Sequence, residues 1–274
     1  MRNLTGRPPM SDLFGVAGRR WLAAQELPAD ERHAVDAGLR LVDLFDAEVA
    51  QVERLIAEQV LECEPIRRLM TLPGVSAITA TALMAAIGDV RRFPSPRHLV
   101  AYLGLNPRVR QSGSEPARHG RISKQGPGEA RHLLVEAAWH ALRTAGPLRA
   151  FGERVRARRG ANIATVAVAR KLVVIAWHML STGEDYAFVR PSLMREKVRR
   201  LELMLGAERR QGRRNPERVF ASVASRAAEQ AQAAQAEEAY RRMMRDWRAS
   251  GAGAGATTGR VKTPSKRRGS AADL

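Results

Sequence analysis

Apolar residues between positions 30 and 64 recur at alternating spacings of three and four. They are Val42, Phe45, Val49, Val52 and Ile56. This spacing is typical of a helix that packs one face against another helix, and acidic residues surround the stripe. Gln59 interrupts the stripe and Pro65 ends the segment. We therefore predict a coiled-coil connector over residues 30–64, paired either with a second copy of the chain or with another helix of the same chain.

Residues 66–88 contain two short apolar helical segments on either side of Pro73-Gly74, and Gly88 closes the second one. This arrangement resembles a helix-hairpin-helix motif, in which backbone amides at the turn bind a phosphate without reading sequence. The amides of Gly74, Val75 and Ser76 would then contact a nucleic-acid backbone. An ordinary helix pair joined by a Pro-Gly turn explains the pattern equally well.

Residues 105–128 form a long loop rich in Gly, Pro, Ser and Arg, and its pieces 108–110 and 121–123 are predicted to pair as a hairpin. Loops of this length inside a domain are usually functional or disordered. Ser112 lies between clustered arginines that would neutralise the charge formed when a serine attacks a phosphodiester. From composition alone, a turn serine remains the simpler interpretation. The predicted phosphate contacts are Arg108, Arg110, Arg118, Arg121, Lys124 and Arg131.

The remaining pattern is helical. Amphipathic or buried helices are predicted over residues 129–143, 148–159, 162–180 and 193–205. Strand alternation is nearly absent, so the predicted fold class is all-α. The predicted organisation is a remnant or linker (1–29), the coiled-coil connector (30–64), a nucleic-acid-binding domain (65–206), a weak helical extension (207–248) and a disordered basic tail (249–274).

The distribution of charge along the chain indicates the kind of partner. The 274 residues include 46 Lys plus Arg and 28 Asp plus Glu, for a net charge of +18 and a pI of about 11.4. The excess is uneven: residues 25–64 hold 3 basic and 11 acidic residues, whereas residues 91–160 hold 15 and 4. A basic surface of this kind points to a polyanionic partner, most simply nucleic acid.

Several classes of protein are disfavoured. A single cysteine, Cys63, excludes an internal disulfide and a cysteine-built zinc site. The carboxylates of residues 65–206 are scattered, so we expect no metal site there and no cofactor, and phosphate loops of the Walker or dinucleotide type are missing. The sequence opens without a secretory signal, and its best apolar run, 163–180, is split by Arg170-Lys171. We expect a cytoplasmic protein without a membrane partner.

Five blocks in a fixed order carry a family resemblance. They are Leu72-Pro-Gly-Val-Ser, Ala86-Ile-Gly-Asp-Val-Arg-Arg-Phe, Leu99-Val-Ala-Tyr-Leu-Gly-Leu-Asn-Pro, Gln111-Ser-Gly-Ser and Gly120-Arg-Ile-Ser-Lys-Gln-Gly. Together they closely resemble the C-terminal domain of insertion-sequence transposases of the IS-110/116/902 group. The resemblance covers residues 65–185, and residues 30–64 are similar to the coiled coil that precedes that domain.

The resemblance implies a recombinase that cuts and joins DNA at the ends of a mobile element, guided by a structured RNA. It implies a C-terminal serine nucleophile, matched here by Ser112, that forms a transient 5′-phosphoserine linkage. It also implies an N-terminal RuvC-like domain that holds divalent metal, for which we find no strand-rich acidic counterpart. We therefore expect a truncated transposase that binds DNA, forms homo-oligomers through the coiled coil and is inactive alone. The alternative is a non-catalytic helix-hairpin-helix nucleic-acid-binding protein.

Overall fold

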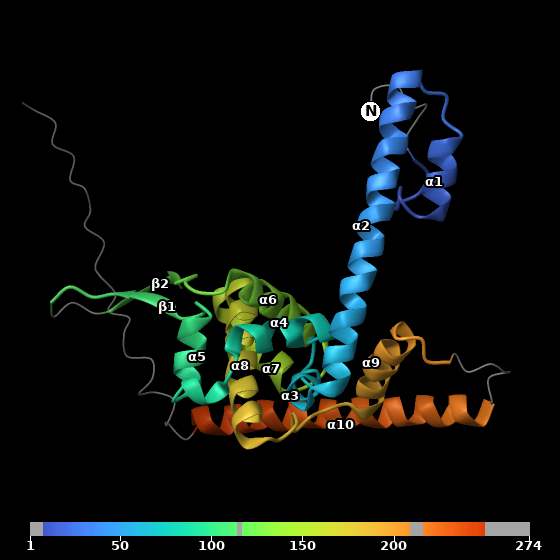
Figure 1. Ribbon diagram of the computed structural model, residues 1–274. Coiled ribbons are helices and arrows are strands. Elements are labelled where there is room, and N and C mark those ends of the chain that lie inside the picture. The colour runs from blue at the N-terminus through green and yellow to red at the C-terminus, as the bar shows by residue number, and fades with distance from the viewer. Residues whose placement is uncertain (1–7, 114–116, 209–215, 250–274) are drawn as a thin grey trace, which may run out of the picture. The chain divides into compact units, whose positions relative to one another are not determined.

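The computed structural model of the chain describes residues 8–113, 117–208 and 216–249 (Figure 1). The chain divides into two compact units, Met1–Glu58 and Gln59–Leu274. The division falls inside one long helix, near its C-terminal end. Residues 250–274, which make up nearly all of the predicted basic tail, lie outside the described residues.

The first unit is built from α1 (Val16–Ala23) and most of α2 (Ala29–Glu62). Arg32 of α2 donates hydrogen bonds to the carbonyls of Leu22 and Gln25, and Arg19 of α1 forms a 2.6 Å ion pair with Asp43. These contacts hold the two helices together. The long helix predicted over residues 30–64 is confirmed as α2, and the middle of its apolar stripe is exposed.

The second unit is assembled around α8 (Ala161–Thr182), which contacts α3 (Glu64–Leu69), α5 (Pro96–Tyr102), α6 (Gly128–Arg143) and α7 (Pro147–Arg159) (Figure 1). By length and composition α8 is apolar enough to cross a membrane, but these four helices cover it and it supplies much of the core. Gly152 lets α7 approach both α6 and α8 closely, since a Cβ there would lie 2.1 Å from a methyl of Leu142 in α6 and 3.0 Å from one of Val168 in α8.

Four further elements of this unit precede α6. Helix α4 (Ala77–Ile87) packs on α3 and α6, and a 3-10 turn, η1 (Val90–Arg92), contacts α8. Strands β1 (Pro107–Arg110) and β2 (Arg118–Ile122) form an antiparallel hairpin. The hairpin was predicted over 108–110 and 121–123, and its second strand begins earlier than expected. Because these are the only strands among the described residues, the all-α prediction is confirmed.

Two helices follow the core. Helix α9 (Pro191–Met204) matches the helix predicted over 193–205. Helix α10 (Pro216–Ala249) contacts both α7 and α9. Its sequence is rich in Ala, Gln, Glu and Arg. Ala233 and Glu237 of this helix are buried, and the Glu237 carboxylate, which is 3% exposed, forms ion pairs with Arg149 of α7 and Arg241. Charged contacts therefore help to attach this helix.

Candidate nucleic-acid interface

The base of the hairpin is fixed to α5 by close backbone contacts. The amide of Lys124 donates to the carbonyl of Gly104 (3.1 Å), and the amide of Ser123 donates to the carbonyl of Asn106 (2.8 Å). Gly104 and Gly126 both have positive φ, at +69° and +76°. A Cβ on Gly104 would lie 2.2 Å from the carbonyl oxygen of Gln125, so this approach requires glycine.

The strands pair in a register that places two arginines opposite each other. Pro107 pairs with Ile122, Val109 with His119, and Arg110 with Arg118. Because three residue steps of β2 match two steps of β1, β2 contains one extra residue, a β-bulge. Like charges directly across a strand pair destabilise it unless an anion lies between them. The Arg110–Arg118 pair is therefore suited to a phosphate.

The other predicted basic contacts divide into two groups. Arg121 and Lys124 are exposed. Arg108 is also exposed but donates to the carbonyl of Ser123 at 3.1 Å. Arg131, at the start of α6, donates to the carbonyls of Leu103 and Gln125 at 3.2 and 3.1 Å. Its guanidinium thus holds the hairpin base against α6, which positions the exposed arginines.

Ser112 lies two residues beyond β1 and is exposed. Gly113 follows it with φ of +56°, and open space surrounds that glycine. To the extent that the loop is described, the Ser112 hydroxyl is free of hydrogen bonds to other residues, and the hairpin arginines are free of ion pairs with carboxylates. The hairpin therefore brings the candidate nucleophile and the arginine pair to one exposed tip.

The Gly74 turn lies at a different place on α6. Gly74 has φ of +80°, and a Cβ there would lie 2.2 Å from the carbonyl oxygen of Ala137. Val75 is fully buried, and Ser76 caps α4 by accepting a hydrogen bond from the amide of Thr79. Arg131 contacts the hairpin from the first turn of α6, whereas Gly74 contacts the second half of α6. Because six residues of a helix span about 9 Å, the predicted turn and hairpin contacts form two separate sets.

A half-buried lysine beside this turn was not predicted. Lys197 of α9 donates to the carbonyls of Met70 (2.7 Å) and Val75 (2.8 Å). Burial lowers the pKa of Lys197 to about 8. A signal for it was present in the sequence, because Lys197 is four residues from both Leu193 and Leu201 and so lies on the apolar face of its helix.

Metal ligands do not gather in the residues that the structure describes: no group of three or more His, Cys, Asp and Glu side chains lies close enough to hold an ion. His132 and Glu136 form an exposed 3.3 Å pair on α6, and His140 is exposed on the same helix. These three residues occupy the solvent side of an amphipathic helix. The chemistry that the interface offers is that of guanidinium groups and a hydroxyl.

Comparisons with known proteins point to the same segment. Residues 66–153 match the model of the transposase IS116/IS110/IS902 family. The chain is 36% identical over 146 residues to a probable family 20 transposase of Pseudomonas aeruginosa, which covers 52% of this chain and 43% of that protein. It is 37% identical over 131 residues to the transposase for insertion sequence element IS1111A of Coxiella burnetii (45% and 35%). It is 31% identical over 144 residues to the transposase for IS1328 of Yersinia enterocolitica (51% and 43%).

The matched segment runs from α3 into α7 and contains the Gly74 turn, the hairpin and α6. The chain spans less than half the length of these curated relatives. The residues matched by the family model include all five sequence blocks that carry the resemblance. Through residues 66–153, the chain is thus similar to the IS116/IS110/IS902 family of transposases.

Proposed function

We propose that this chain acts in DNA transposition in the cytoplasm, as the part of an insertion-sequence transposase that binds DNA and supplies the nucleophile. The observation that carries the proposal is the exposed hairpin tip. Arg110 and Arg118 are paired there across the strands, and Ser112 lies two residues after Arg110. Two guanidinium groups facing each other stabilise a phosphate that lies between them. A hydroxyl beside such a phosphate is placed to attack it.

The proposed reaction is a transesterification. The Oγ atom of Ser112 loses its proton and forms a bond to phosphorus, while the bond from phosphorus to the 3′ oxygen breaks and that oxygen takes up a proton. The product is a 5′-phosphoserine linkage and a free 3′ hydroxyl. The arginines stabilise the charge that gathers on the phosphoryl oxygens. The divalent metal that the family resemblance implies would be held by an RuvC-like domain and not by this hairpin.

We propose two partners besides DNA. A structured guide RNA, implied by the resemblance, fits the basic composition of residues 91–160. A second copy of the chain fits α2, where Phe45, Val49 and Val52 are 63%, 56% and 53% exposed at coiled-coil spacing. Pairing two such helices would bury the stripe. Val49→Asp is therefore expected to convert a dimer into a monomer in light-scattering measurements, and an unchanged mass would contradict pairing through α2.

The binding step is tested by salt dependence. For duplex DNA, each neutralised phosphate contributes about 0.9 to the slope of log K against log salt. The double variant Arg110→Gln/Arg118→Gln should lower this slope by about 2. Arg91→Gln is the matched control, because Arg91 is exposed but pairs with Asp89 at 2.8 Å. An equal slope for the hairpin variant and the unaltered chain would refute the interface.

The chemical step needs a separate test, because a non-catalytic binder would show the same salt dependence. Residues 66–153 of this chain replace the segment of the Pseudomonas relative that aligns with them, and the chimera is incubated with nicked element ends that trap a covalent adduct. We expect an adduct that Ser112→Ala abolishes while DNA affinity stays unchanged. If Ser112→Ala still forms the adduct, Ser112 is not the nucleophile. If the chimera binds the ends and forms no adduct, the non-catalytic alternative is favoured.

A further inference from the structure

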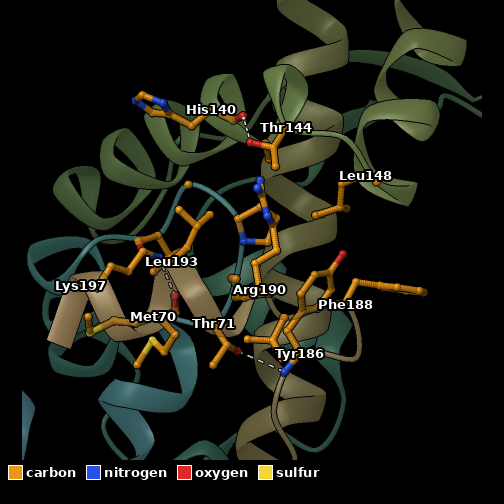
Figure 2. A pocket seen from close by; sticks show the side chains of 18 of the residues that line it. Met70, Thr71, His140, Thr144, Leu148, Tyr186, Phe188, Arg190, Leu193 and Lys197 are labelled. Atoms are coloured by element: carbon orange, nitrogen blue, oxygen red, sulfur yellow. Dashed lines mark hydrogen bonds between the residues drawn. The ribbon is translucent and has the colours of Figure 1, made fainter. Parts of the chain in front are cut away.

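A pocket of about 340 Å³ lies beside the Gly74 turn (Figure 2). One wall is the turn itself, residues 70–76, and another is the C-terminal end of α6 with His140 and Thr144. The segment 186–190 and the first two turns of α9 close the remaining sides. This volume is near the lower end of the range for small-ligand sites, so it suits a ligand of one ring system and not a larger one.

The charge of the pocket is one-sided. The residues that line it all belong to the described part of the chain, and they include His140, Arg190 and Lys197 but no Asp or Glu. Figure 2 shows the Arg190 side chain reaching into the pocket towards Thr144. The Lys197 ammonium bonds two carbonyls at the turn. An anionic group is the ligand that Arg190 and Lys197 would attract.

Arg190 is the lining residue whose hydrogen-bonding points most directly to a ligand. Its Nε atom is buried and has no hydrogen-bond partner among the residues that the structure describes. The nearby Glu229 interacts with Arg190 electrostatically, but its carboxylate accepts hydrogen bonds from the amide and hydroxyl of Ser192 instead. A buried donor without an acceptor costs free energy and calls for an explanation such as an absent ligand. A phosphate oxygen would provide the acceptor.

The rest of the lining is apolar and partly aromatic. Leu72, Val75 and Leu148 are buried at its walls. Tyr186 and Phe188 pack edge to face with ring centroids 5.7 Å apart, and Phe188 is 44% exposed at the rim. Apolar walls with an aromatic rim and an arginine are the surroundings in which proteins hold an unstacked base next to its phosphate. The pocket thus offers separate places for a planar ring and for an anion.

We propose that this pocket binds a single unpaired nucleotide of the DNA strand, with its base against the apolar wall and its phosphate on Arg190. The inference rests on the proposed DNA binding and adds a second contact, separate from the hairpin. It assigns the Gly74 turn a role as a wall of this pocket. It also explains why the segment between α8 and α9 holds Tyr186 firmly, through a 3.1 Å bond from its amide to the hydroxyl of Thr71.

The test uses the full chain and three 20-base-pair duplexes: one fully paired, one with a single bulged 2-aminopurine, and one with an abasic bulge at the same position. We expect the 2-aminopurine bulge to bind about tenfold more tightly than the abasic bulge, since stacking one base on a protein has an effect of this size. We also expect the 2-aminopurine fluorescence to change on binding. Free 2-aminopurine nucleotide at the same concentration should give no change.

Variants locate the effect. Arg190→Gln removes the charge, and Leu193→Trp fills the mouth of the pocket from a side chain that is already 37% exposed. Leu193→Trp should abolish the preference for the base, whereas Arg190→Gln should weaken binding to both bulged duplexes, because both carry the phosphate. Each variant should leave binding to the paired duplex unchanged. Arg195→Gln is the matched control, because Arg195 is exposed on the same helix but does not line this pocket. Circular dichroism of each variant verifies that it is folded.

The outcomes separate the two proposals. Equal affinity for the base and the abasic bulge, with tight binding to paired DNA, overturns the pocket assignment and leaves the hairpin interface standing. A response to the free nucleotide as large as to the bulge overturns the assignment to a nucleotide within a strand. Absence of binding to all three duplexes overturns the proposed DNA binding, and the pocket assignment with it.

Discussion

Removing the charge of Glu237 should release α10 from the rest of its unit. Its carboxylate oxygen Oε2 accepts hydrogen bonds from the amide of Gly146 (2.9 Å) and from Nε of Arg149 (2.9 Å), and the same oxygen forms a 2.8 Å ion pair with Nη2 of Arg149. Arg241, one turn further along α10, donates to it at 2.6 Å and also pairs with Glu153 of α7. The charge network therefore joins α10 to both the start and the middle of α7.

The expected size follows from burial. Breaking a buried ion pair by removing one partner costs about 3–5 kcal/mol, because the other charge is left without compensation. Glu237→Gln keeps the shape and removes the charge, so we expect a loss of about 3 kcal/mol in the free energy of unfolding. Glu238 is the matched control: its carboxylate is 51% exposed and pairs with Arg245 at 3.1 Å. Glu238→Gln should cost at most about 1 kcal/mol.

The pKa of Glu237 provides a second signature. Burial opposes its ionisation, but the Gly146 amide and the guanidinium groups of Arg149 and Arg241 outweigh burial and hold its pKa below the ordinary 4.5. A carboxyl whose pKa is lowered in the folded state stabilises the fold fully above its unfolded pKa. This stabilisation is lost as the pH falls through the folded pKa, below 4.5.

Urea unfolding followed by far-UV circular dichroism measures the free energy, and hydrogen exchange of the Gly146 amide reports the contact directly. In Glu237→Gln that amide should exchange at least about tenfold faster, since a hydrogen bond to a charged group contributes about 1.5–3 kcal/mol. The stability difference between Glu237→Gln and the unaltered chain should shrink below pH 4.5. Equal losses in Glu237→Gln and Glu238→Gln would refute the buried-charge explanation of how α10 packs.

Three further predictions concern the hairpin base, the turn and the core. Gly126→Ala should destabilise the chain by roughly 2–5 kcal/mol in urea unfolding, because a left-handed backbone costs about 1–2 kcal/mol and steric crowding about 1–3 kcal/mol. Gly113 is the control, because its φ is also positive but no described atom crowds it. Gly113→Ala should therefore show only the backbone cost. The pKa of Lys197 is about 8 when folded and 10.5 when unfolded. The unfolded state therefore holds more protons between these values, so stability should rise with pH across this interval by up to about 3 kcal/mol, and a Lys197→Met variant should lack the rise. Trp177→Phe removes a 3.0 Å bond to the carbonyl of Phe93 and should lower the thermal midpoint through a loss of about 1–2 kcal/mol.

The helices and the hairpin could be predicted because each depends on residues that are close together in the sequence. The spacing of apolar residues gave α2 and α9 almost to their ends, and Ser76 caps α4 as a serine at a helix start should. The β-bulge moved the start of β2 because an extra residue changes the pairing without leaving a mark in short, polar strands. Element types therefore follow from the sequence more readily than register does.

Contacts between distant residues could not be predicted in the same way. Glu237 lies 91 positions from Gly146, and Lys197 lies 122 positions from Val75. A polar sequence predicts exposure, and only the packed structure shows that Glu237 is buried and Lys197 half-buried, each with hydrogen-bond partners. The pocket beside the Gly74 turn has the same origin, because three segments that are far apart in sequence form its walls. Charged side chains buried between elements are where pattern analysis fails, and here they hold α9 and α10 in place.

The blocks that carry the family resemblance have two physical roles. Gly104 and Gly126 permit the close approach of two backbone segments, and Arg131 then bonds carbonyls from both. These residues fix the hairpin base and have a structural role. Arg110 and Ser112, by contrast, are exposed and free of structural hydrogen bonds among the described residues. The contacts at the hairpin base must offset the repulsion between Arg110 and Arg118 at its tip. A fixed base that holds two like charges side by side is the arrangement expected of a surface that binds an anion.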